Sequence, residues 1–149
     1  MPLIGVSRFE RFFRAAAGID VDKEDLKRYN DFLNQKLYDM LVVSEAAAKA
    51  NRRDIIEPWD LPITKGLQEC MHHFRDMDEE LDLAAILEEL TALPPLDLSL
   101  SEESESRLPM VVGGLSVALA RAFKIVEPEV KNPASEQWER MIRLFGLLL

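Results

Sequence analysis

The stretch that decides the fold is residues 51–70, NRRDIIEPWDLPITKGLQEC. A long helical pattern ends at its two arginines, and Ile55 and Ile56 have the β-branched side chains typical of a short strand. Pro58 disfavours helical backbone at the residue before it, and Asp60 is a suitable residue to begin the next helix. The stretch therefore predicts the end of one helix, a brief extended step and the start of another.

The sequence before and after this stretch has helical periodicity. Residues 7–17 place apolar side chains at helical spacing. From Lys23 to about Arg52 there is no glycine or proline, and one apolar stripe predicts a helix of about eight turns. A third helix is expected from Asp60. Its apolar stripe is Ile63, Leu67, Cys70, Met71 and Phe74.

Residues 76–149 repeat this order of short, long and short helices. A first helix is expected to end at the pair Pro94 and Pro95, and leucines then alternate with polar residues as in a short strand. In the second long helix, Pro109 predicts a bend or a late start. The glycine pair that follows, Gly113 and Gly114, suits a crossing point between the two long helices.

The last helix is expected to start at Ser135 and to bury one face. That face is Trp138, Met141, Ile142 and Phe145. Two copies of one plan thus account for the chain. We expect one compact all-α domain, residues 1–149, with a first half at 1–75 and a divergent, acidic half at 76–149.

Each half needs the other, because two short helices cannot cover the apolar stripe of a long one. The expected arrangement is an internal pseudo-dimer within one chain. In it, residues 19–21 lie near 130–132, and residues 96–100 lie near Ile55 and Ile56.

The first half resembles the archaeal histones of the histone-fold family. Residues 11–16, Arg-Phe-Phe-Arg-Ala-Ala, are similar to part of that family's first helix. Arg53 and Asp60, seven residues apart, are similar to the pair that clamps its second loop by a salt bridge. The resemblance implies two histone folds joined by a handshake. In the second half Lys131 aligns with Arg53, but Trp138 stands at the aspartate position.

The resemblance also implies DNA binding, for which the basic residues of the first half are the candidates. These are Arg8, Arg11, Arg14, Lys23, Lys27, Arg28 and Arg52. Residues 1–75 carry twelve Lys and Arg against twelve Asp and Glu, so the net charge of −9 comes from residues 76–149. An acidic protein repels DNA at long range, and Asp54 and Glu57 stand where the resemblance implies lysines. A solvated helix face is the alternative interpretation of these cations.

No pattern in the sequence indicates catalysis, a cofactor or a metal. Cys70, His72 and His73 lack the spacing of a zinc site, and Cys70 falls on the apolar stripe. Adjacent acids such as Glu79 and Glu80 do not face each other on a helix. We therefore expect no enzymatic activity.

Trp59 lies in the loop between Pro58 and Asp60, either packed over the third helix or exposed as an anchor for a partner. We expect a protein interaction or assembly module that binds another protein or further copies of itself. Weak, nonspecific DNA binding by the basic first-helix face is the alternative. The single cysteine and the lack of a membrane-spanning apolar run predict a cytoplasmic protein with no membrane partner, associated with the nucleoid if it binds DNA.

Overall fold

The computed structural model describes residues 6–81 and 95–148. Within them the chain forms helices, two short strands and one 3₁₀ turn. The elements are α1 (Val6–Ala17), α2 (Lys23–Ala50), β1 (Ile55–Ile56), η1 (Pro58–Asp60), α3 (Lys65–Leu81), β2 (Ser99–Leu100), α5 (Glu102–Val126) and α6 (Ser135–Leu148). The chain is mainly helical, so the predicted all-α class is confirmed. The short helix expected to end at Pro94 and Pro95 lies almost entirely in residues 82–94, outside the described residues.

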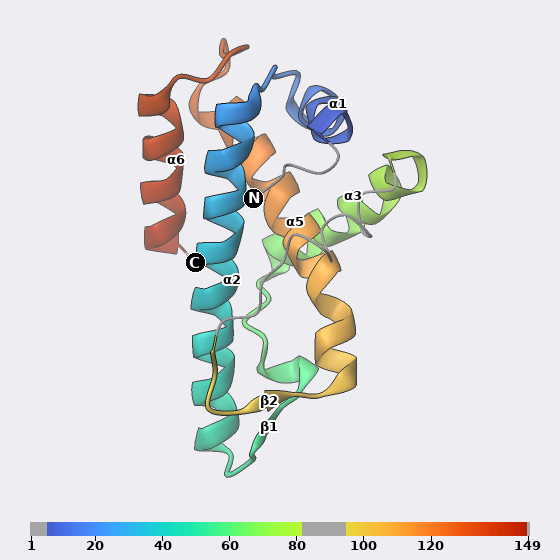
Figure 1. Ribbon diagram of the computed structural model, residues 1–149, viewed down its shortest axis with the longest axis vertical. Coiled ribbons are helices and arrows are strands. Elements are labelled where there is room, and N and C mark those ends of the chain that lie inside the picture. Colours follow the sequence, from blue (N-terminus) through green and yellow to red (C-terminus); the bar gives the residue numbers. More distant parts are fainter. Residues whose placement is uncertain (1–5, 82–94, 149) are drawn as a thin grey trace.

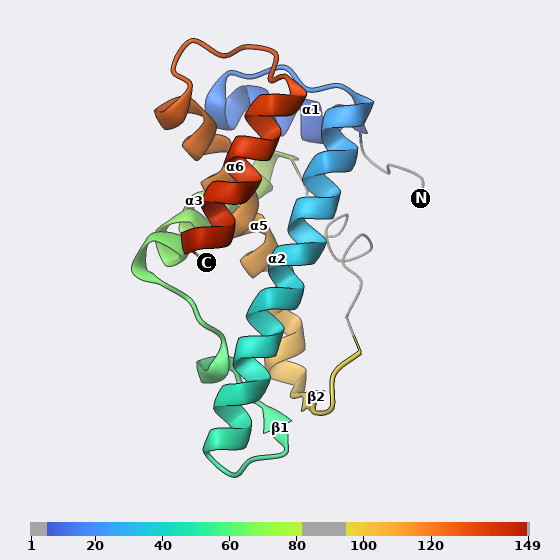
Figure 2. The ribbon, with the colours of Figure 1, turned by 90° about the vertical axis from the view of Figure 1, so that its left-hand side faces the viewer.

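The two long helices, α2 and α5, pass each other at an angle and form the centre of the molecule (Figure 1). α1 lies at the end where α2 begins and α5 finishes, and the strands lie at the opposite end (Figure 1). α6 runs beside the first half of α2, whereas α3 lies against α5 (Figures 1 and 2). Each long helix is therefore covered by a short helix from the other half of the chain.

The start of α2 is fixed by a reciprocal pair of bonds. The carboxylate of Asp22 accepts the N–H of Asp25 at 2.8 Å, and the carboxylate of Asp25 accepts the N–H of Asp22 at 3.0 Å. This pattern satisfies N–H groups that have no partner inside the helix. At the other end Arg52 has a φ of 58°, which turns the chain away from the helix axis toward β1.

The third helix starts later than predicted. Pro58–Asp60 form a single 3₁₀ turn, and α3 begins only at Lys65. Thr64 Oγ1 accepts the N–H of Leu67 at 3.1 Å and so takes the capping role expected of Asp60. Asp60 cannot cap α3, because its carboxylate is bound within the preceding turn.

The second long helix does not start late. α5 begins at Glu102, where the Ser101 hydroxyl accepts the N–H of Ser104 at 3.1 Å, and Pro109 lies inside the helix. Proline removes the bond to the carbonyl four residues earlier, at Glu105. The helix nevertheless continues without a break from Glu102 to Val126. The late start predicted from Pro109 is therefore wrong.

Gly113 and Gly114 face α3 and not α2. A Cβ added to Gly113 would overlap the ring of Phe74, and one added to Gly114 would lie 3.2 Å from the backbone nitrogen of Met71. The glycines thus let α3 approach α5 closely. The predicted role of these glycines at the crossing of the two long helices is wrong. At that crossing the Tyr29 and Ser116 hydroxyls share a buried hydrogen bond of 2.7 Å.

Loops from the two halves meet at both ends of the molecule. β1 pairs with β2 in parallel, with Ile55 opposite Ser99 and Ile56 opposite Leu100. At the other end, the N–H of Asp20 donates to the carbonyl of Lys131 at 2.6 Å. Both pairings expected between the halves are thus present.

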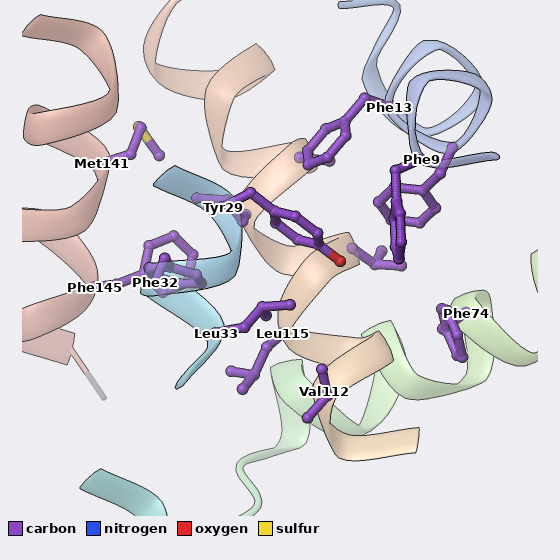
Figure 3. Close-up of a cluster of buried hydrophobic side chains, with 14 of the residues drawn as sticks. Phe9, Phe13, Tyr29, Phe32, Leu33, Phe74, Val112, Leu115, Met141 and Phe145 are labelled. Carbon is purple, nitrogen blue, oxygen red and sulfur yellow. The ribbon is translucent and has the colours of Figure 1, made fainter. Parts of the chain in front are cut away.

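Aromatic side chains from α1, α2 and α6 meet at the centre of the core (Figure 3). Phe13 and Tyr29 pack edge to face with ring centroids 5.1 Å apart, and Phe32 packs in the same way on Phe145 at 5.2 Å. Edge-to-face packing adds to the free energy gained by burying the rings. These contacts tie short helices from both halves to α2.

α5 is the one helix in the described residues that is long and apolar enough to cross a membrane. Of the most apolar 18-residue stretch of α5, 56% is buried inside the protein. Burial of this kind is typical of a core helix, and its contacts with α1 and α3 account for its apolar sequence.

Candidate functional site

Arg53 and Asp60 form a salt bridge through two parallel hydrogen bonds. Nη1 donates to Oδ2 and Nη2 to Oδ1, each at 2.6 Å. The Asp60 side chain is only 2% exposed, and its carboxylate also accepts the N–H of Glu57 at 2.8 Å. The bond from Arg53 is the main reason why the pKa of Asp60 lies below its ordinary value. The salt bridge therefore closes the turn between β1 and α3 and fixes its backbone.

This closed turn exposes Trp59 to solvent. Trp59 is 71% exposed, while Pro58 and Asp60 on either side of it are buried. The guanidinium carbon of Arg53 lies 5.8 Å from the centre of the indole ring, which is within range of a cation–π contact. Of the two interpretations of Trp59, the structure fits exposure and not packing over α3. We call residues 58–60 the Trp59 turn.

The chain next to the Trp59 turn is held from α5 and α2. The carbonyl of Ile56 accepts the Ser104 hydroxyl at 2.8 Å and the N–H of Ser101 at 3.1 Å. The carboxylate of Glu45 accepts the N–H groups of Asp97 and Leu98, at 2.8 and 3.1 Å, just before β2. These bonds fix the backbone at β1 and β2, and β1 lies two residues before Trp59 in the chain.

The basic candidates do not share one surface. Arg8, Arg11 and Arg14 lie on α1, close to the start of α2, where Lys23, Lys27 and Arg28 are found. Arg52 follows the other end of α2 (Figure 1). A helix of 28 residues is about 42 Å long at 1.5 Å per residue, so Arg52 is remote from the other six.

Acidic side chains bind Arg14 and Arg28 among the cations near α1. Arg14 Nε lies 3.4 Å from Asp20 Oδ1. Arg28 Nη1 lies 3.5 Å from Asp25 Oδ1, and its Nη2 donates to the Ser135 hydroxyl at 2.7 Å. Carboxylates among these cations lower the positive potential that a DNA backbone would meet. The structure thus gives a mixed surface at this end and not a continuous basic one.

In the second half, the position that corresponds to the aspartate of the clamp is used differently. Trp138 is fully buried, and its Nε1 donates to Asp25 Oδ1 at 2.9 Å. Burial is the main reason why the pKa of Asp25 lies above its ordinary value. Trp138 thus binds Asp25, a residue of the cap of α2 in the first half. An arginine–aspartate clamp at this position would instead have joined two residues of the second half.

The Trp138 bond had no signal in the sequence beyond the tryptophan itself. A buried indole N–H needs an acceptor, so Trp138 on an apolar face was a signal for a buried polar partner. The identity of that partner depends on the packing of α6 against α2, which spacing along the chain does not report.

No group of three or more His, Cys, Asp or Glu side chains in the described residues could hold a metal ion. Cys70 is half-buried, and burial raises the pKa of its thiol, whereas His72 and His73 are exposed on α3. Burial of this kind disfavours the thiolate that binds metals. The structure thus does not bring Cys70, His72 and His73 together as a set of three metal ligands.

Fold and site together define an all-α protein with a clamped turn that exposes a tryptophan. Residues 9–146 match the family described as "Domain of unknown function (DUF1931)", and the chain belongs to that family. A crystal structure of a Thermus thermophilus protein is 55% identical, covers 97% of each chain and has a TM-score of 0.85. One of an Aquifex aeolicus protein has the same TM-score at 23% identity over 100% of each chain, which shows a shared fold alone.

Two proteins of Aquifex aeolicus (strain VF5) are also similar in sequence, and each is described as "Uncharacterized protein". One is 27% identical over 135 residues, covering 91% of this chain and 78% of the relative. The other is 30% identical, covering 82% of this chain and 78% of the relative.

The predicted membership of the histone-fold family, based on the resemblance to archaeal histones, is wrong. The family that matches nearly the whole chain is DUF1931, and the similar solved structures are proteins of that kind. The residues behind the resemblance were not specific. An arginine and an aspartate seven residues apart can close a helix–loop–helix turn in any family, because the bond needs only that local geometry.

Proposed function

We propose that the protein is a non-enzymatic protein interaction module and that the Trp59 turn is its contact surface. One observation carries this proposal: a tryptophan that is 71% exposed stands on a turn closed by two 2.6 Å bonds. Tryptophan and arginine are enriched among the residues that dominate binding free energy. A turn that is rigid before binding loses little conformational entropy when a partner covers it.

The proposal includes a shape for the module: two histone-fold-like halves, residues 1–75 and 76–149, paired by a handshake within one domain. This describes topology and not family. It is supported by the pairing of β1 with β2 at one end and by the Asp20–Lys131 backbone bond at the other. Pairing within one chain makes the partner half available at high effective concentration. The single cysteine suits a cytoplasmic site of action.

Weak, nonspecific DNA binding is the second candidate function. It is favoured by Arg11, Lys23 and Lys27, which are exposed at the α1 end of the molecule. It is opposed by the Arg14–Asp20 and Arg28–Asp25 contacts and by the net charge of −9. The interaction module is therefore the better-supported proposal.

The test compares the protein with Trp59→Ala and with Ile125→Ala, a matched control at an apolar residue that is 80% exposed near the other end of α5. Each protein is immobilised, and retained cellular proteins are identified and then titrated in purified form. We expect at least one partner that binds the protein and Ile125→Ala with equal affinity and Trp59→Ala at least about tenfold more weakly. The same partners at equal affinity for all three proteins would contradict the proposal.

A duplex DNA shift assay at low salt tests the second candidate. Binding that falls steeply with salt and is lost in an Arg11→Ala, Lys27→Ala double variant would favour it. Absence of a shift for the unmodified protein would remove it.

A further inference from the structure

The Trp59 turn lies at the end of the molecule that carries the two strands. α5 starts beside β2 at this end (Figure 1), and the turn contacts both α5 and α2. The N–H of Ser101 donates to the Ile56 carbonyl, so the first residues of α5 lie close to the chain just before Trp59. We call residues 49–60 and 97–107 the strand end. Charges on the strand end contribute to the potential that a partner meets at Trp59.

The strand end is acidic. It carries seven Asp and Glu against four Lys and Arg, which gives it a net charge of −3. Three of these cations are bound to acids of the strand end: Lys49 to Asp97 at 3.0 Å, Arg53 to Asp60 at 2.6 Å and Arg107 to Glu103 at 3.0 Å. The other four acids form no salt bridge within the described part of the chain: Asp54, Glu57, Glu102 and Glu105. All of these four except Glu57 are exposed.

The Trp59 ring already has one cation over it. The guanidinium carbon of Arg53 lies 5.8 Å from the ring centre, and the two bonds to Asp60 hold the guanidinium in place. Trp59 is nevertheless 71% exposed, so most of the indole is open to a partner. The face of an indole attracts cations, and guanidinium groups stack on it more often than ammonium groups do. An arginine of a partner can therefore stack on the open part of the ring.

The charges of the strand end also disfavour other classes of partner. An acidic protein segment or a nucleic-acid backbone would bring like charges together around Trp59. An apolar partner would cover the tryptophan but would remove nearby carboxylates from water without giving them a bond. A basic partner has neither disadvantage, because its cations meet the carboxylates that have no salt bridge.

We propose that the partner of the Trp59 turn is a basic protein segment. One of its arginines stacks on the indole of Trp59, and its other cations face Asp54, Glu102 and Glu105. This inference rests on the proposed function and deepens it by naming the class of partner. Binding weakens as salt is added, since salt screens exposed charges.

The potential at Trp59 can be measured without a partner. The chain has two tryptophans and Trp138 is fully buried, so dissolved ions quench chiefly the fluorescence of Trp59. Quenching by caesium and by iodide is measured, each relative to its quenching of free tryptophan. We expect caesium to quench more strongly than iodide, because cations gather at an acidic surface. Trp59→Phe gives the background from Trp138.

Two double variants with the same change in net charge test the source of this potential. Glu102→Lys with Glu105→Lys should lower the ratio of caesium to iodide quenching at least about twofold. Glu129→Lys with Glu136→Lys is the control, because these exposed residues follow α5 and begin α6, far from the strand end (Figure 1). The control should leave the ratio unchanged. Circular dichroism verifies that each variant is folded.

Synthetic peptides test the class of partner with the full chain. Fluorescence anisotropy compares a labelled peptide of repeated Arg-Gly-Ser with peptides that carry glutamine or glutamate in place of arginine. We expect the arginine peptide to bind at least about tenfold more tightly than either of the others. Trp59→Ala and the Glu102→Lys, Glu105→Lys variant should each weaken its binding at least about fivefold, whereas the control double variant should stay within about twofold.

Any of four results would overturn the inference: iodide that quenches Trp59 at least as well as caesium, a glutamine peptide that binds as tightly as the arginine peptide, arginine-peptide binding unchanged in Trp59→Ala, or equal loss in the two double variants. A cellular partner that is lost in Trp59→Ala but binds the Glu102→Lys, Glu105→Lys variant unchanged would also overturn it and would leave the proposed function standing. If no cellular partner depends on Trp59, the proposed function falls and this inference falls with it.

Discussion

Trp138 of α6 donates its indole N–H to Asp25, the residue whose carboxylate also accepts the Asp22 N–H at the start of α2. One carboxylate thus joins the cap of a long helix in the first half to a short helix of the second. Local structure and the pairing of the halves depend on the same side chain.

Replacing Trp138 with Phe is expected to destabilise the protein by about 1–3 kcal/mol, since a buried acceptor loses its donor while most of the ring packing is kept. Chemical denaturation followed by circular dichroism measures the change. Trp59→Phe is the matched control, and its effect should stay within about 0.5 kcal/mol because the side chain is exposed. If the two replacements lowered the free energy of unfolding equally, the bond from Trp138 to Asp25 would have no particular role in stability.

Replacing Arg53 with Lys is expected to destabilise the protein although the charge is retained. Lysine cannot reproduce the two parallel bonds to Asp60, whose carboxylate is nearly buried. We expect a loss of about 1–3 kcal/mol in the free energy of unfolding, with a larger loss for Arg53→Ala. Lys65→Ala removes an exposed salt bridge to Glu69 and serves as the control, with an effect below about 1 kcal/mol.

The clamp should also make stability depend on pH in acid. The pKa of Asp60 is lower in the folded chain than its ordinary value of 3.8, chiefly because of the Arg53 bond. The unfolded chain therefore takes up this proton first as the pH falls. The stabilisation is complete above 3.8 and is lost as the pH falls through the lower folded value. Asp60→Asn should be less stable at neutral pH and lose less stability between about pH 4 and about pH 2 than the unmodified protein, as measured by denaturation at each pH.

Replacing Gly113 with Ala should destabilise the protein, although alanine favours helix by up to about 1 kcal/mol. The new methyl would overlap the Phe74 ring, and that ring is fully buried. We expect a net loss of about 1–3 kcal/mol in thermal or chemical unfolding. Gly66→Ala in α3 is the matched control, since a Cβ there meets nothing within 4 Å, and it should be neutral or stabilising. A neutral Gly113→Ala would mean that α3 can move away from α5 without cost.

The elements that follow from local pattern could be predicted from the sequence. The apolar stripe and the lack of glycine and proline located α2 to within two residues of its end, and two β-branched residues located β1. The start of α3 was not predictable in this way, since Asp60 and Thr64 both suit a cap. Asp60 is bound by Arg53 instead, across a turn whose geometry the sequence does not state.

The candidate site was predictable in its residues but not in its exposure. The spacing of Arg53 and Asp60 suggested a bond, whereas the position of Trp59 left both packing and exposure open. The separation of Arg52 from the other basic candidates follows from the length of α2 alone. Periodicity does not report which helix approaches α5 at Gly113, so the close approach of α3 at this residue could not be predicted.

The buried hydroxyls of Tyr29 and Ser116 have a consequence for how the long helices align. Apolar side chains alone would tolerate a shift of α2 along α5 by one turn, because apolar contacts are not directional and can be replaced by similar ones. Such a slip would leave the buried Tyr29 hydroxyl away from water and without the Ser116 oxygen that lies 2.7 Å from it, whereas the Ser116 hydroxyl would keep its bond to the Val112 carbonyl. The Tyr29–Ser116 hydrogen bond therefore favours one alignment of the two long helices and makes neighbouring alignments unfavourable.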